Sequence, residues 1–105
     1  MSLDKCIALT KNSFDEYVAS HDSIVIFHKK LCPHCKIMGT VLQKTQAKIA
    51  GLHLAAVDSE DEEDLKQRLG AERVPTLLVY KQGQLRAKFT GIMNPAETIK
   101  FYQHA

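Results

Sequence analysis

The chain has 105 residues, of which 45% are hydrophobic and 25% are charged, a composition typical of a globular protein and not of a disordered or membrane-embedded one. This length suits a single domain, which we expect to span residues 1-105 without a linker. The net charge is only +2 and the 14 basic residues are spread along the chain. Nucleic acid is therefore not an expected partner, and no segment approaches the roughly 20 apolar residues of a membrane span.

The first five residues, Met1-Ser2-Leu3-Asp4-Lys5, contain no apolar stretch of the kind that marks a signal peptide. We therefore expect a cytoplasmic protein. The alternative is a periplasmic protein in which Met1-Ser2-Leu3 stands in place of a removed leader.

Short apolar runs alternate along the chain with amphipathic stretches of helical period, which favours an α/β fold. A short first strand is expected at residues 6–9, and Ser13-Phe14-Asp15-Glu16 is a capping-box pattern that predicts a helix start. Ile24-Val25-Ile26-Phe27 is typical of a central strand that is covered on both faces. From Pro33 onward, apolar residues at helical spacing predict a helix that ends near Gly51.

The next strand is predicted at residues 52–57 and is followed by an acidic run from Asp58 to Asp64. Within this run, Ser59-Glu60-Asp61-Glu62 has the form of a second capping box, and Gly70 lies behind the short helix that it would open. Acidic side chains at a helix N-terminus are favoured by the helix dipole. We therefore interpret the run as a solvated helix start.

The last third of the chain predicts a hairpin and a final helix. Thr76 to Tyr80 is apolar enough for a central strand, and the turn at Gly83 leads into an edge strand in which apolar and basic residues alternate. Asn94-Pro95-Ala96-Glu97 is a third capping pattern. The expected order is β-α-β-α-β-α-β-β-α, with one central mixed sheet and helices on both faces.

Two of the three cysteines lie in Cys32-Pro33-His34-Cys35, between a predicted strand and a predicted helix. Side chains three residues apart on a helical turn are about 5 to 6 Å apart at Cβ, which a disulfide tolerates. Cys32, at the expected N-cap, faces the positive end of the helix dipole, which lowers the pKa of its thiol. We therefore expect Cys32 to be the nucleophile and the more buried Cys35 to resolve the mixed disulfide.

Pro33, His34 and Lys36 are expected to tune the redox properties of the cysteine pair. Pro33 lacks an amide hydrogen and holds a helical φ, so it shapes the first turn. A protonated His34 adds positive charge beside the Cys32 thiolate and makes the disulfide a stronger oxidant. The alternative is a surface histidine with little influence. Lys36 and two lysines that precede the motif add further positive charge, and salt in solution screens its effect on the cysteines.

Metal binding is the competing interpretation of a Cys-x-x-Cys sequence. A structural zinc site needs four ligands and usually a second cysteine pair, which this chain lacks. Cys6, His28 and His53 are scattered along the sequence. We therefore expect no metal site, and we expect Cys6 to be an inert buried thiol of the first strand.

Taken together, these features resemble the thioredoxin family over essentially the whole chain. The matching features are the strand Ile24 to Phe27, Cys32-Pro33-His34-Cys35 with Lys36, Val74-Pro75-Thr76, the Gly83 hairpin and Gly91. The resemblance implies the thioredoxin fold, a cis peptide bond before Pro75, and a proline that lies against the cysteine pair. It also implies that the backbone of Val74 receives substrate and that Gly91 lies close to the same groove.

The chain departs from typical thioredoxins between and around its cysteines. Pro33-His34 replaces the usual Gly-Pro and resembles the pair found in periplasmic oxidants of the DsbA type. We therefore expect a reduction potential between about −270 mV for thioredoxin and about −120 mV for DsbA. His28 and Leu31 stand where the family has tryptophans, so we expect them to alter substrate binding.

A second departure concerns the proton of Cys35. The family's buried aspartate aligns with Ile26, and the lysine that pairs with it aligns with Leu54. If that alignment holds, Cys35 must lose its proton to water, to His34 or to another group.

The resemblance implies a protein-disulfide oxidoreductase, expected to be a monomer without a bound cofactor and to receive electrons from an NADPH-linked flavoprotein resembling thioredoxin reductase. One alternative is a glutaredoxin-like reductase that uses glutathione, although the extra first strand and helix resemble thioredoxin more. Another alternative is a non-catalytic metal carrier or scaffold, against which an activated cysteine pair argues.

Overall fold

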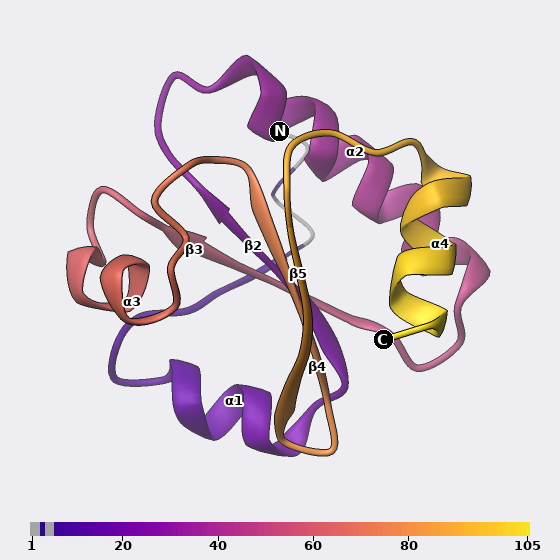
Figure 1. Cartoon of the computed structure of the whole chain (residues 1–105), viewed down its shortest axis with the longest axis horizontal. Helices are drawn as coiled ribbons and strands as arrows, with labels where there is room; N and C mark the ends of the chain where they lie inside the picture. The colour runs from indigo at the N-terminus through magenta and orange to yellow at the C-terminus, as the bar shows by residue number, and fades with distance from the viewer. Residues whose placement is uncertain (1–2, 4–5) are drawn as a thin grey trace.

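Five strands form one mixed sheet at the centre of the computed structural model, which describes residue 3 and residues 6–105 (Figure 1). The strands are β1 (Ile7–Ala8), β2 (Ser23–His28), β3 (His53–Asp58), β4 (Thr76–Lys81) and β5 (Gln84–Thr90). Their order across the sheet is β1-β3-β2-β4-β5. Strand β3 runs parallel to β1 and β2, whereas β4 is antiparallel to β2 and β5. The predictions for residues 1, 2, 4 and 5 lie outside the described residues.

Helices cover both faces of the sheet, so the predicted element order and the thioredoxin fold are confirmed. The helices are α1 (Phe14–Ser20), α2 (Pro33–Lys48), α3 (Glu63–Arg68) and α4 (Pro95–Gln103). Helices α1 and α3 pack on one face and α2 and α4 on the other. Among the described residues, no helix is long and apolar enough to span a membrane.

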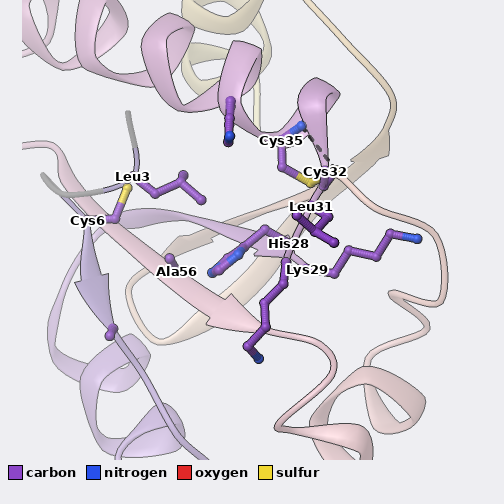
Figure 2. A pocket seen from close by; sticks show the side chains of 11 residues that line it. Leu3, Cys6, His28, Lys29, Leu31, Cys32, Cys35 and Ala56 are labelled. Carbon is purple, nitrogen blue, oxygen red and sulfur yellow. Dashed lines mark hydrogen bonds between the residues drawn. A yellow bond between two sulfur atoms is a disulfide. The ribbon is translucent and has the colours of Figure 1, made fainter. Parts of the chain in front are cut away.

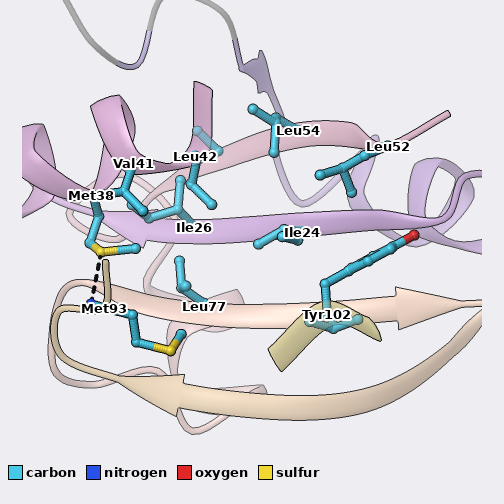
Figure 3. Packing of buried hydrophobic residues seen from close by; sticks show 12 residues of the cluster. Ile24, Ile26, Met38, Val41, Leu42, Leu52, Leu54, Leu77, Met93 and Tyr102 are labelled. Carbon is cyan, nitrogen blue, oxygen red and sulfur yellow. Dashed lines mark hydrogen bonds between the residues drawn. The ribbon is translucent and has the colours of Figure 1, made fainter. Parts of the chain in front are cut away.

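Strand β2 is the centre of the core because its side chains alternate between the two faces and are fully buried on both. Ile24 and Ile26 point toward α2 and α4, whereas Val25 and Phe27 point toward α1 and α3. Figure 3 shows the first of these clusters, in which the backbone N–H of Met93 donates a hydrogen bond to Sδ of Met38 at 3.4 Å. This bond ties the segment before α4 to α2, the helix that carries the cysteine pair.

Two of the three predicted capping boxes are wrong. The Oγ of Ser13 makes no bond to α1 and instead accepts one from the backbone N–H of Thr10 at 3.0 Å. The backbone N–H of Ser59, in the turn after β3, donates to the carbonyl of His28 at 2.7 Å, so it is not available to a capping box. Helix α3 therefore begins only at Glu63. In both places another hydrogen bond competes with the cap.

The third capping box and the hairpin turn are as predicted. Asn94 Oδ1 accepts from the backbone N–H of Glu97 at 2.8 Å, and Glu97 Oε1 accepts from the backbone N–H of Asn94 at 3.0 Å. Between β4 and β5, Gln82 and Gly83 have φ values of 55° and 78°. Two consecutive positive φ angles are typical of a type I′ turn, which matches the twist of the strands that it joins.

We predict that Asn94→Ala lowers the free energy of unfolding by about 1 kcal/mol, because it removes the cap of α4. Asn94→Asp, which keeps a side-chain acceptor at the same position, is the matched control and is expected to stay close to the wild type. Equilibrium denaturation in urea measures both. Equal stability of the wild type and the alanine variant would contradict the role of the box.

Candidate active site

The cysteine pair lies where β2 passes into α2. Cys32 is the N-cap residue of α2, and Pro33 occupies the first helical position. Cys32 and Cys35 form a disulfide with a Cα–Cα distance of 5.3 Å. The backbone N–H of Cys35 donates to Sγ of Cys32 at 3.2 Å, so the first sulfur accepts from an amide that would otherwise lack a helical partner.

The two cysteines differ in their exposure to solvent, which distinguishes their chemical roles. Cys32 is 7% exposed, whereas Cys35, one turn further into the helix, is 1% exposed. An incoming sulfur can therefore approach Cys32 but not Cys35. This arrangement suits attack by Cys32 and internal resolution by Cys35.

The turn before Cys32 brings an apolar side chain to the surface. Leu31 has a φ of 54°, which a non-glycine residue rarely adopts, and the chain reverses there to enter α2. Its side chain is 95% exposed. Backbone conformations of this kind occur often at binding sites, where the surrounding structure holds them in place.

Lys30 attaches this turn to the acidic segment that follows β3. Its Nζ lies 2.9 Å from Oδ2 of Asp58 and 3.3 Å from Oδ1 of Asp61, and its backbone N–H donates to Oε1 of Glu60 at 2.9 Å. Partial burial disfavours the charged carboxylate of Asp58, but the bonds from Lys30 and from the amide of Glu60 lower its pKa overall. Lys30 is therefore paired with carboxylates. Their negative charges offset the positive charge that we expected Lys30 to contribute near the cysteines.

An outer cavity of about 340 Å³ opens beside the sulfur of Cys32. Five of the ten site residues predicted from the sequence line it together with Lys29, and these five are Leu31, Cys32, Pro33, His34 and Val74. Val74 precedes a cis peptide bond to Pro75, as the resemblance implies. The carbonyl of Pro75 accepts a hydrogen bond from the backbone N–H of Gly91 at 3.0 Å, so Gly91 is directly attached to this segment.

An inner cavity of about 330 Å³ lies on the other side of the disulfide (Figure 2). The residues that line it are Leu3, Cys6, Ala8, His28, Lys29, Lys30, Leu31, Cys32, Cys35, Lys36 and Ala56. In Figure 2, His28 lies between the disulfide and the side of the cavity formed by Cys6 and Ala56. Lys36 and His28 therefore belong to this inner space, whereas Leu31 lines both cavities.

The position of Cys6 differs from the prediction. It precedes β1 and is only partly buried, so it is neither within the strand nor in the interior of the core. Burial nevertheless raises the pKa of its thiol to about 11. Cys6 shares a cavity with the cysteine pair, which no local sequence pattern predicts because it depends on how β1 pairs with β3.

The strand register also corrects the expected partner of Ile26. Leu54 pairs with Ile24, and the residue beside Ile26 on β3 is Ala56. Ile26 is fully buried and Ala56 is 5% exposed. Both positions are apolar, as expected, but the small side chains of Ala56 and Ala8 leave room for the inner cavity.

Among residue 3 and residues 6–105, no group of three or more histidine, cysteine or acidic side chains is arranged to hold a metal ion.

Comparison with known proteins relates this site to a large family. The sequence profile of the Thioredoxin family matches residues 5–104. The mitochondrial thioredoxin of Bos taurus is 40% identical over 80 residues, which are 74% of this chain and 48% of that protein. A protein disulfide-isomerase of Arthroderma benhamiae is 35% identical over 77 residues, which are 70% of this chain and 15% of that protein. The chain thus spans about half or less of the length of these relatives.

Solved structures agree with the fold. The reduced form of desulfothioredoxin from Desulfovibrio vulgaris Hildenborough superposes with a TM-score of 0.83 at 39% identity, covering 96% of this chain and 99% of that chain. Oxidised mitochondrial thioredoxin 3 from Saccharomyces cerevisiae superposes with a TM-score of 0.87 at 23% identity and full coverage of both chains. The second likeness concerns the fold alone.

We predict that limiting iodoacetamide at pH 7 labels Cys32 of the reduced protein at least about tenfold faster than Cys6, because each pKa unit changes the thiolate fraction about tenfold. The pKa of Cys6 is about 11, so nearly all of it is protonated at this pH. Cys35 is expected to react slowly because it is buried. Peptide mass spectrometry measures the three rates, and equal labelling of Cys6 and Cys32 would contradict this account.

Proposed function

The chain belongs to the thioredoxin family, and from this premise we propose that it is a thiol-disulfide oxidoreductase that exchanges its Cys32–Cys35 pair with protein disulfides. The observation that supports this most directly is the position of Cys32 at the N-cap of α2, with Cys35 joined to it by a disulfide one turn away. A thiolate is stabilised at such a helix N-terminus.

The proposed reaction has two exchange steps. The Cys32 thiolate attacks one sulfur of a substrate disulfide, forming a mixed disulfide and expelling the other substrate sulfur as a thiolate, which takes up a proton. Cys35 then loses its proton and attacks Sγ of Cys32, and the second substrate sulfur leaves as a thiolate. The substrate gains two electrons, and the protein ends as the Cys32–Cys35 disulfide.

The outer cavity is the proposed binding site for the substrate. An extended peptide would lie along the backbone of Val74, beside Pro75 and Gly91, with its disulfide above Cys32. The exposed side chain of Leu31 would supply apolar contact in place of an aromatic ring. The prediction that His28 also binds substrate has less support, because His28 lines only the inner cavity.

We further propose that the disulfide is more oxidising than that of a typical thioredoxin. His34 is exposed beside Cys32 in the outer cavity, where its positive charge would favour the thiolate. Protein disulfide-isomerases have potentials near −180 mV, about 90 mV above thioredoxin, which sets the scale of the proposed difference.

The expected electron donor is an NADPH-linked flavoprotein that resembles thioredoxin reductase, with no cofactor bound to the chain itself. Residues 1-105 would act as one domain and as a monomer. The cytoplasm is the predicted location, with the periplasm as the alternative; the bovine relative is a mitochondrial protein.

We predict that the reduced wild type reduces insulin disulfides and that Cys32→Ser abolishes this turnover. Cys35→Ser is expected to accumulate a mixed disulfide with insulin, because the resolving thiol is absent. Cys6→Ser is the matched control and should turn over like the wild type. Intact-mass spectrometry detects the trapped species. Turnover that requires glutathione would instead support the glutaredoxin alternative, and no turnover with either donor would support a non-catalytic module.

We predict that His34→Ala lowers the reduction potential of the pair by about 30 mV, which corresponds to a tenfold change in the exchange equilibrium. The variant removes the imidazole that, when protonated, would stabilise the Cys32 thiolate and hence the dithiol form. His104→Ala, at the C-cap of α4, removes a histidine remote from the site and serves as the control. Equilibration against glutathione buffers measures both, and an unchanged potential would remove His34 from this role.

A further inference from the structure

Cys35 can resolve a mixed disulfide only after it loses its proton, and its surroundings in the core supply no obvious acceptor. The side chain is 1% exposed, so bulk solvent does not reach it from the outer face. Ile26 and Ala56, which lie side by side in the sheet, carry no titratable group. The inner cavity is the remaining space that Cys35 borders together with polar side chains.

The side chains that line the inner cavity differ in their ability to accept a proton. Lys29, Lys30 and Lys36 line it, but an ammonium group has three donors and no acceptor. The thiol of Cys6, with a pKa of about 11, is already protonated at neutral pH. A neutral imidazole has one acceptor nitrogen. Among the described residues that line the cavity, and apart from the redox pair, His28 is therefore the one group that can take a proton at neutral pH.

We propose that His28 is the proton acceptor for Cys35 during resolution of the mixed disulfide, acting across the inner cavity through water. The cavity is wide enough for water, and His28 lies between the disulfide and the far wall (Figure 2). The inference rests on the proposed function. It gives a half-buried residue at the end of β2 a part in the chemistry of the reaction.

The thiol proton of Cys35 passes to the imidazole of His28, and the sulfur lone pair forms the bond to Sγ of Cys32. The bond between Cys32 and the substrate sulfur breaks, and its electron pair leaves with the substrate thiolate. The imidazolium then releases its proton to solvent. When the protein oxidises a substrate, the same groups act in reverse and His28 returns the proton to Cys35.

Burial, and not the surrounding charge as a whole, favours the neutral imidazole of His28. Burial is the largest effect and lowers its pKa below the usual 6.5, and the positive charge of Lys30 acts in the same direction. The carboxylates of Asp58 and Asp61 and a hydrogen bond with the backbone of Lys29 oppose the shift but do not cancel it. Cys6 and Lys36 face the cavity from the N-terminal segment and from α2. The base is therefore available above about pH 6.5 and is lost below its own pKa.

The test separates attack from resolution in the native chain. Reduced protein is mixed with substoichiometric 5,5′-dithiobis(2-nitrobenzoate) in a stopped-flow instrument; the first thionitrobenzoate released reports attack by Cys32 and the second reports resolution by Cys35. Cys6 is expected to contribute little because its thiol is protonated. In the wild type, the rate of the second phase should be constant above pH 6.5 and should decrease at pH values below the pKa of His28. Its midpoint should match the pKa of His28 measured by NMR.

His28→Gln should leave the first phase unchanged and slow the second about 100-fold at pH 7, the lower end of the effect of a positioned base. Its second-phase rate should rise tenfold per pH unit up to the pKa of Cys35. His53→Gln removes an exposed histidine that does not line the cavity, and it is the matched control. Circular dichroism verifies that each variant is folded, and added imidazole should accelerate the second phase of a His28→Gly variant.

Two results would overturn the inference. One is a second phase of the wild type whose rate has its pH midpoint above 8, as expected for a thiol, and not at the pKa of His28. This result requires no variant. The other is a folded His28→Gln variant with the wild-type pH profile. Failure of the proposed function looks different, since the wild type would then show no rapid first phase at all.

Discussion

The contact between Cys32 and the first turn of α2 is the interaction on which the site depends. A helix begins with amide groups that have no carbonyl partner, and here one of them donates to the sulfur of Cys32. Pro33 fits the first helical position because it has no amide hydrogen to leave unpaired. The helix start thus places the sulfur of Cys32 at the positive end of the helix dipole and holds Cys35 within bonding distance, without any metal or cofactor in the proposed chemistry.

The rest of the fold supports this helix start from two sides. The fully buried strand β2 leads the chain to the site, and Lys30 attaches the intervening turn to the carboxylates that follow β3. A second segment, Val74 and Pro75, lies at the outer face of the disulfide. A cis peptide bond joins these two residues, and the carbonyl of Pro75 accepts a hydrogen bond from the backbone N–H of Gly91. Small residues on β1 and β3 leave open the space on the inner face. The disulfide therefore lies between two cavities of different chemistry.

Much of this arrangement could be predicted from local patterns. The strand and helix periods, the third capping box at Asn94 and the Cys-x-x-Cys motif each depend on neighbouring residues, and each is present. Most of the errors arise from long-range pairing, whereas the box at Ser13 fails through a local bond, because its Oγ accepts from the amide of Thr10. Ser59 fails as a cap because the carbonyl of His28, 31 positions earlier, accepts its amide hydrogen. Strand register, which places Ala56 beside Ile26 and Cys6 near the cavity, is likewise decided by tertiary contacts.

The two edge strands of the sheet are poorly suited to pairing with other polypeptide chains. Strand β1 has only two residues, and β5 carries exposed basic side chains such as Arg86. Short or charged edge strands discourage pairing with a second polypeptide, which is how many β-sheet proteins avoid aggregation. Under the proposed function, an extended substrate segment that binds near Val74 would find few competing places along the sheet to add a strand.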